Sequence, residues 1–249
     1  MCPWKTTRTL CAVLLLVPLL HLAVLKSTET MALLDGSPAA WQSEIDAYNA
    51  AIVIERLPVD PVVVVGGRLV QLWPGLEAAL DPLPVLRRGL GDATVDDIRY
   101  HYESLVGVYR PATVVLLPGS SEFQIRDNKS ADELFDSIRE LAEVDAAHGR
   151  TSVFYVFAPL HTPRYPGDQH KIRQVTARLV HWAGTRDGVE VIDPNPLLAD
   201  RSGGPDPRWF RGNGVHLNDG GFLRLSLLLQ HALLHRQPGD TTLAASQPH

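Results

Sequence analysis

The chain has 249 residues, a formal net charge of −5 and 45% hydrophobic residues. This length suffices for a large α/β domain with a substantial core, and the acidic balance excludes the strongly basic surface that nucleic-acid binding requires. The two cysteines, Cys2 and Cys11, stand at the N-terminus, so disulfide and cysteine–metal chemistry is excluded from the rest of the chain.

A hydrophobic segment comes first. Lys5 and Arg8 precede an apolar run from Leu10 to Leu25, which is the pattern of a secretory signal or a membrane anchor. No convincing small-residue cleavage site follows closely. We therefore expect residues 1–26 to remain as an uncleaved signal anchor in the inner membrane, with the rest of the chain periplasmic or otherwise extracytoplasmic. Secretion after cleavage of the signal is the alternative.

Strand and helix patterns alternate along the remainder. Residues 27–60 read as a linker and an amphipathic helix with Trp41, Ile45 and Tyr48 on one face. Strands are expected at about 61–65, 84–86, 112–117, 151–157 and 189–192. Helices are expected from 69 onward and at 94–108, 131–147, 169–184 and 221–234. This alternation predicts a doubly wound parallel sheet within residues 61–236, followed by a polar, disordered tail at 237–249.

The first of these strands carries the position that matters most for function. The valine run 62–65 is typical of a strand buried on both faces, and Gly66 and Gly67 allow a sharp turn into the next helix. In an open α/β sheet, ligands and catalytic groups gather at the carboxyl ends of the strands. Arg68 is expected there.

Four short motifs, each at the end of an expected strand, carry a family resemblance. They are Val65–Trp73, Arg88–Thr94, Leu117–Glu122 and Gly214–Asn218. In this order the chain resembles the SGNH/GDSL-type hydrolases, which are esterases and lipases. The resemblance implies a flavodoxin-like three-layer α/β/α sandwich with a five-stranded parallel sheet, here preceded by an N-terminal hydrophobic helix.

The resemblance also assigns site positions, and this chain departs from most of them. The nucleophilic serine position falls on Arg68, the oxyanion glycine on Asp92, the oxyanion asparagine on Ser121 and the triad acid on Asn213. Among the family's catalytic residues, His216 alone is retained. A guanidinium is always protonated and cannot attack an acyl carbon, and a carboxylate at Asp92 opposes the negative charge of the transition state.

These departures together predict a degenerate, catalytically inactive member with a binding or partner role in the cell envelope. A small anionic or carbohydrate molecule is the candidate ligand. The alternative is an esterase or acetylesterase that acts on carbohydrate or lipid esters through a non-standard site, with Ser120 or Ser121 as a displaced nucleophile and His216 as its base.

The replacements also predict an ion pair. Arg68 at a helix N-terminus is disfavoured by the helix dipole, so we expect Asp92 to pair with it and close the former pocket. Arg68 as an anchor for an anionic ligand is the alternative. Asp92 is also a candidate acceptor for the helix that begins after Thr94, where Thr94 and Asp97 have capping-box spacing. No metal or cofactor is expected, because His231 and His235 form the one paired histidine spacing and lack a zinc-protease glutamate.

Overall fold

The structure is a computed structural model that describes residues 14, 16–18, 37–54, 57–124 and 127–235. Its centre is a five-stranded, wholly parallel sheet in the order β2-β1-β3-β4-β5. The strands are β1 (Val62–Gly66), β2 (Val85–Gly89), β3 (Thr113–Leu117), β4 (Val153–Phe157) and β5 (Val189–Ile192). This is the strand order of flavodoxin-like doubly wound sheets, and the predicted fold class is confirmed.

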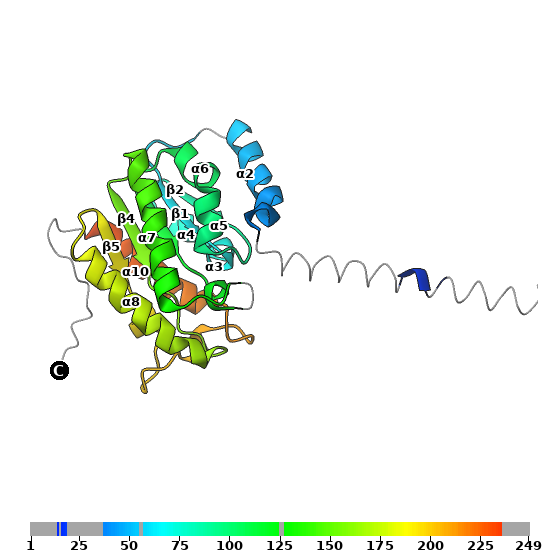
Figure 1. Cartoon of the computed structure of the whole chain (residues 1–249), viewed down its shortest axis with the longest axis vertical. Coiled ribbons are helices and arrows are strands. Elements are labelled where there is room, and N and C mark those ends of the chain that lie inside the picture. Colours follow the sequence, from blue (N-terminus) through cyan, green and yellow to red (C-terminus); the bar gives the residue numbers. More distant parts are fainter. Residues whose placement is uncertain (1–13, 15, 19–36, 55–56, 125–126, 236–249) are drawn as a thin grey trace, which may run out of the picture.

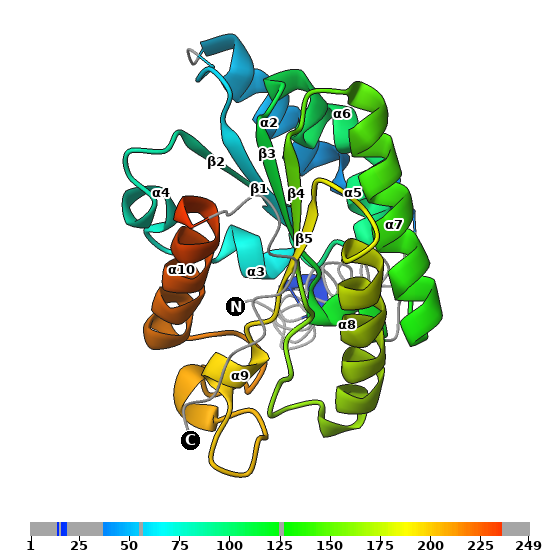
Figure 2. The same cartoon turned by 90° about the vertical axis from the view of Figure 1, so that its left-hand side faces the viewer.

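Helices cover both faces of the sheet and make the three layers visible in Figures 1 and 2. One face carries α2 (Gln42–Ile54), α5 (Val95–Tyr100), α6 (Tyr102–Leu105), α7 (Ala131–His148) and α8 (Gln169–Ala183). The other carries α3 (Arg68–Gln71), α4 (Leu76–Ala79), α9 (Asn195–Leu198) and α10 (Asp219–Leu234). Short 3₁₀ segments are η1 (Pro38–Trp41), η2 (Gly107–Tyr109), η3 (Ser120–Phe123), η4 (Pro166–Asp168) and η5 (Pro207–Trp209).

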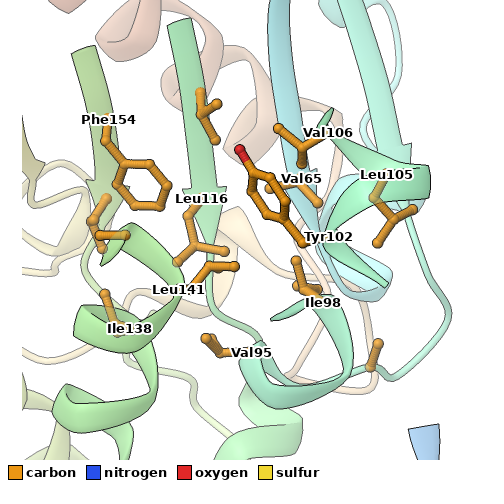
Figure 3. Packing of buried hydrophobic residues seen from close by; sticks show 14 of the residues in the cluster. Val65, Val95, Ile98, Tyr102, Leu105, Val106, Leu116, Ile138, Leu141 and Phe154 are labelled. Carbon is orange, nitrogen blue, oxygen red and sulfur yellow. The ribbon is translucent and has the colours of Figure 1, made fainter. Parts of the chain in front are cut away.

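The valine run of β1 explains why this strand lies inside the sheet. Side chains alternate between the two faces of a strand, so Val63 and Val65 enter one core cluster while Val62 and Val64 enter the other. Figure 3 shows the first cluster, where Val65 lies among residues of neighbouring strands and of α5 and α6. All four valines are at most 6% exposed, so both faces of β1 contribute hydrophobic free energy to folding.

The expected continuous helix over 94–108 is wrong, because α5, α6 and η2 share this stretch. The chain leaves helical geometry at His101 and again at Val106, where φ is −133°. Ile98, Tyr102 and Leu105 nevertheless all face the same core cluster, so their spacing mimics one unbroken helix. Apolar periodicity reports the buried face and does not detect a break that keeps that face inward.

The predictions for the two ends of the chain fall largely outside the described residues. Of the expected anchor at 1–26, residues 14 and 16–18 are described, and the expected tail at 237–249 lies wholly outside. Across the described residues, no helix is both long and apolar enough to span a bilayer. Of the face expected for residues 27–60, Ile45 and Tyr48 lie on α2 and Trp41 lies before it in η1, and Ile45 is only 2% exposed.

Candidate functional site

A small cavity lies at the carboxyl ends of β1 and β3, the neighbouring strands at the switch point of the sheet, where ligands bind in doubly wound folds. It is lined by Arg68, Leu69, Asp92, Pro118, Gly119, Ser120, Ser121, Leu160, Thr162, Val215 and His216. The space open to the centres of water-sized molecules measures about 30 Å³, and the empty volume including solvent at the open mouth is about 420 Å³. Four of the five site residues named from the sequence therefore line one cavity, and Asn213 contacts it through His216.

Close backbone approach at the end of β1 explains why glycine occupies the turn into α3. A Cβ on Gly66 would lie 2.5 Å from the carbonyl oxygen of Leu117, and one on Gly67 would lie 2.7 Å from that of Ala93. These glycines let the loops after β2 and β3 pack directly against the turn. Arg68 follows as the first residue of α3 and is thereby aimed at the loop after β2.

Arg68 and Asp92 form the predicted ion pair. Arg68 Nε donates to Asp92 Oδ1 at 2.7 Å, and Arg68 Nη2 donates to Oδ2 at 2.9 Å. This bidentate geometry matches the planar guanidinium to the planar carboxylate, and the hydrogen bonds to Asp92 raise the pKa of Arg68 further. The side chains are 39% and 45% exposed. The pair lines the cavity and remains in contact with solvent, so the expectation that it closes the former pocket is wrong.

The serine side chains of the cavity come from the loop after β3. Ser121 Oγ donates to the carbonyl oxygen of Ala93 at 3.3 Å, so this hydroxyl proton is directed at the backbone. Ser120 also lines the cavity, and its hydroxyl makes no hydrogen bond to any other described residue. The loop therefore offers a single uncommitted hydroxyl to a ligand.

His216 and Asn213 are held together on the turn before α10. The amide nitrogen of Asn213 lies 2.7 Å from His216 Nδ1. The amide oxygen of Asn213 accepts from the backbone N–H groups of Val215 and His216, each at 3.1 Å. Burial lowers the pKa of His216 below its ordinary value of 6.5, and the positive charge of Arg68 lowers it further. Both effects favour the neutral imidazole.

A buried ionic network behind the loop was missed by sequence reasoning. Glu122 is 0% exposed and accepts from the backbone N–H of Val95 at 2.7 Å and from Lys129 Nζ at 2.7 Å. Lys129 Nζ also lies 2.7 Å from Asp96 Oδ2. The signal was present, because Glu122 directly follows Ser121 in the third motif. The network fixes the loop that carries Ser120 and Ser121 to the start of α5.

This network corrects one expectation about Asp92. The helix that begins after Thr94 does have the predicted capping box, in which Thr94 N donates to Asp97 Oδ2 at 2.9 Å. The N–H of Val95, however, is satisfied by Glu122 and not by Asp92. Among the described residues, both Asp92 oxygens accept from Arg68 alone. The acceptor for the Val95 N–H is therefore Glu122, which tertiary folding brings from the segment after β3, and not Asp92, which is closer in the sequence.

Helix α2 forms one border of the site through a polar side chain that its amphipathic pattern did not single out. Glu44 accepts from the backbone N–H of Gly91 at 3.1 Å, next to Asp92. Farther along α2, Tyr48 donates to the carbonyl oxygen of Gly89 at 2.8 Å, and the Arg88 guanidinium lies 5.0 Å from its ring. These contacts fix α2 against the strand end that delivers Asp92.

Among the described residues, no group of three or more histidine, cysteine or acidic side chains is arranged to hold a metal ion. His231 and His235 stack on each other with ring centroids 4.5 Å apart near the end of α10. Their spacing therefore reflects a local ring contact.

Comparison with known proteins identifies the fold. No family model and no curated sequence matches the chain. Among solved structures, a Streptococcus pneumonia protein named for platelet activating factor superposes with a TM-score of 0.67 and 16% identity, covering 85% of this chain and 98% of its own. A GDSL-like lipase from Bacteroides thetaiotaomicron gives 0.65 and 17%, covering 76% and 96%. A carbohydrate esterase family 3 structure from Talaromyces cellulolyticus gives 0.57 and 16%, covering 71% and 96%. The chain has the fold of SGNH/GDSL-type hydrolases.

Proposed function

We propose that this chain is a non-catalytic member of the SGNH hydrolase fold, a pseudo-hydrolase that binds a ligand or partner through the former catalytic cleft. It would act in the cell envelope, attached to the membrane by residues 1–26. One observation carries the proposal: the Arg68–Asp92 ion pair lines the cavity at the end of β1, where the resemblance assigns the nucleophile.

Each replaced residue removes a different part of acyl transfer. Arg68 offers no hydroxyl and cannot form an acyl intermediate. Asp92 places a carboxylate where a hydrolase needs donors for the oxyanion. Ser121 directs its proton to the carbonyl of Ala93. Asn213 cannot stabilise an imidazolium, and in a serine protease the corresponding Asp→Asn change costs about 10⁴ in rate. Together these changes support loss of hydrolysis.

The retained histidine does not rescue the chemistry. His216 is the family's catalytic residue, yet a general base needs a nucleophile within hydrogen-bond reach. The hydroxyl of Ser120 lines the same cavity, but no hydrogen bond joins it to His216. His216 is therefore assigned to ligand contact.

A hydrolysis assay tests the proposal. The full-length protein in detergent is incubated with short acyl esters and with a serine-directed fluorophosphonate probe. We expect no turnover above buffer and no labelling. Turnover that His216→Ala abolishes would overturn the non-catalytic assignment and would favour the alternative, an esterase or acetylesterase with a displaced nucleophile.

A restored variant provides the positive control. The quadruple change Arg68→Ser, Asp92→Gly, Ser121→Asn and Asn213→Asp rebuilds the positions that the resemblance assigns. We expect the fluorophosphonate to label the serine introduced in place of Arg68, because its hydroxyl would then face His216 held by an acid. A folded variant with neither labelling nor turnover would show that the residue assignment is wrong.

A further inference from the structure

Asn213 determines which nitrogen of His216 carries the proton. Because two backbone N–H groups point at the Asn213 amide oxygen, the amide nitrogen must be the atom that faces His216 Nδ1 at 2.7 Å. An amide nitrogen only donates, so Nδ1 must accept and carries no proton. The neutral ring is therefore protonated at Nε2.

This tautomer is the reverse of the one a hydrolase needs. An acid at position 213 would accept from Nδ1–H and leave Nε2 as the proton acceptor. With asparagine there, Nε2–H becomes a donor. Since Nδ1 is turned toward Asn213, the Nε2 edge is the one left to face the cavity that His216 lines.

A second donor group faces the same cavity. Arg68 uses Nε and Nη2 for Asp92, and its Nη1 makes no hydrogen bond to another described residue. The charges of Arg68 and Arg211 lower the pKa of His216, and the charge of Asp92 raises it. Arg68 and His216 line one cavity. The Arg68 charge acts on His216 more strongly than the Asp92 charge does, so Asp92 offsets the Arg68 charge only in part at the His216 ring.

From this geometry we propose that the cleft is a receptor for the carboxylate group of a small ligand, held between Arg68 Nη1 and the Nε2–H of His216, with Ser120 as a third donor. The inference rests on the proposed function, since His216 as a donor excludes His216 as a base. The space of about 30 Å³ open to the centres of water-sized molecules admits a small group such as a carboxylate. Asp92, which borders the same space, disfavours a doubly charged phosphate.

Nitrogen-15 NMR of the histidine ring tests the first step. We expect His216 in the full-length protein to show a protonated Nε2 and an unprotonated Nδ1 near neutral pH. Asn213→Asp should move the proton to Nδ1 and raise the pKa of His216, because the new carboxylate accepts from Nδ1–H. Protonation of Nδ1 in the unmodified protein would overturn the inference, even if the protein hydrolyses nothing.

Titration with acetate tests the second step. Acetate should shift the His216 Nε2 signal, and Arg68→Met should weaken this binding by about tenfold or more, since a hydrogen bond to a charged group is worth roughly 1.5–3 kcal/mol. Asp92→Asn should strengthen binding, because it removes a negative charge from the wall of the cavity. The matched control is Arg178→Met, which breaks a comparable surface pair with Asp132 and should leave binding unchanged.

Neutral and doubly charged probes complete the test. Acetamide and methyl glucoside should bind more weakly than acetate, and inorganic phosphate should gain more than acetate does from Asp92→Asn. Acetamide binding equal to that of acetate, or no acetate shift at roughly 50 mM, would overturn a carboxylate receptor. Ester turnover would instead overturn the proposed function, so the two failures are distinguishable.

Discussion

Arg68 and Asp92 decide the character of the site, and their exposure limits what they add to stability. Each side chain keeps more than a third of its surface in solvent, where water screens the attraction and ordering two side chains costs entropy. The bidentate geometry places this pair toward the upper end of the range for exposed pairs. We therefore interpret the pair as a device that shapes the cavity wall.

A double-mutant cycle tests this interpretation. With Arg68→Met, Asp92→Asn and the combined variant, urea unfolding should give a coupling free energy of about 0.5–1 kcal/mol. All three variants should remain folded, because neither residue belongs to the core. A coupling of roughly 3 kcal/mol or more would instead mean that the pair behaves as a buried salt bridge and that its main role is structural.

At the scale of elements, the loop after β3 is held by an ion network. Two of the three side chains of this network are buried, unlike the exposed Arg68–Asp92 pair. Lys129 and Glu122 are 8% and 0% exposed, whereas Asp96 is 38% exposed. Burial raises the pKa of Glu122 to about 7, although Lys129 and the N–H of Val95 favour the charged form. This folded-state pKa lies above the ordinary value of 4.5. The contribution of Glu122 to stability is therefore full below pH 4.5 and is lost as the pH rises through 7.

Removal of Lys129 should expose this linkage. We expect Lys129→Met to destabilise the protein by about 3–5 kcal/mol at pH 8, because it leaves a buried carboxylate without its counter-charge. The loss should be smaller at pH 5, where Glu122 is protonated. Denaturant unfolding at the two pH values measures the difference.

A matched double variant keeps the hydrogen bond from Val95 to residue 122 and removes the charge of the Glu122 carboxylate. Glu122→Gln combined with Lys129→Met retains an oxygen that can accept from Val95 and leaves Asp96 with Arg99 and Ser137. This double variant should recover much of the lost stability at pH 8. If it is as unstable as Lys129→Met, or if the loss is the same at both pH values, an unpaired carboxylate is not the cause.

At the scale of the whole molecule, the sequence predicted what local pattern controls. The valines of β1 alternate between two cores, so their continuous apolar run identified a central strand, and the four motifs placed Arg68, Asp92, Ser121 and His216 at one edge. The sequence could not predict which polar groups, distant along the chain, would form hydrogen bonds with each other. Glu122 in η3 accepts a hydrogen bond from the backbone N–H of Val95, and Glu44 on α2 accepts one from the backbone N–H of Gly91. Such partners depend on tertiary packing, which periodicity does not record.

The proposed N-terminal anchor would determine where this cleft is presented. Two cations followed by the apolar run from Leu10 to Leu25 favour insertion with the N-terminus inside. The run is slightly shorter than the roughly 20 residues of a typical span, so the charged residues at its ends would have to reach the interface. An uncleaved anchor would keep the binding cleft close to the membrane surface.

Membrane fractionation tests the anchor at the level of the intact chain. We expect the full-length protein to resist extraction by high salt, to dissolve in detergent and to have the mass of all 249 residues. Leu15→Asp with Leu16→Asp should release it, because each charge at the centre of a span costs about 2.5–3.5 kcal/mol, whereas Leu15→Val with Leu16→Val should not. A soluble product that lacks the first residues would contradict the anchor and would establish a cleaved signal, with the cleft then acting free of the membrane.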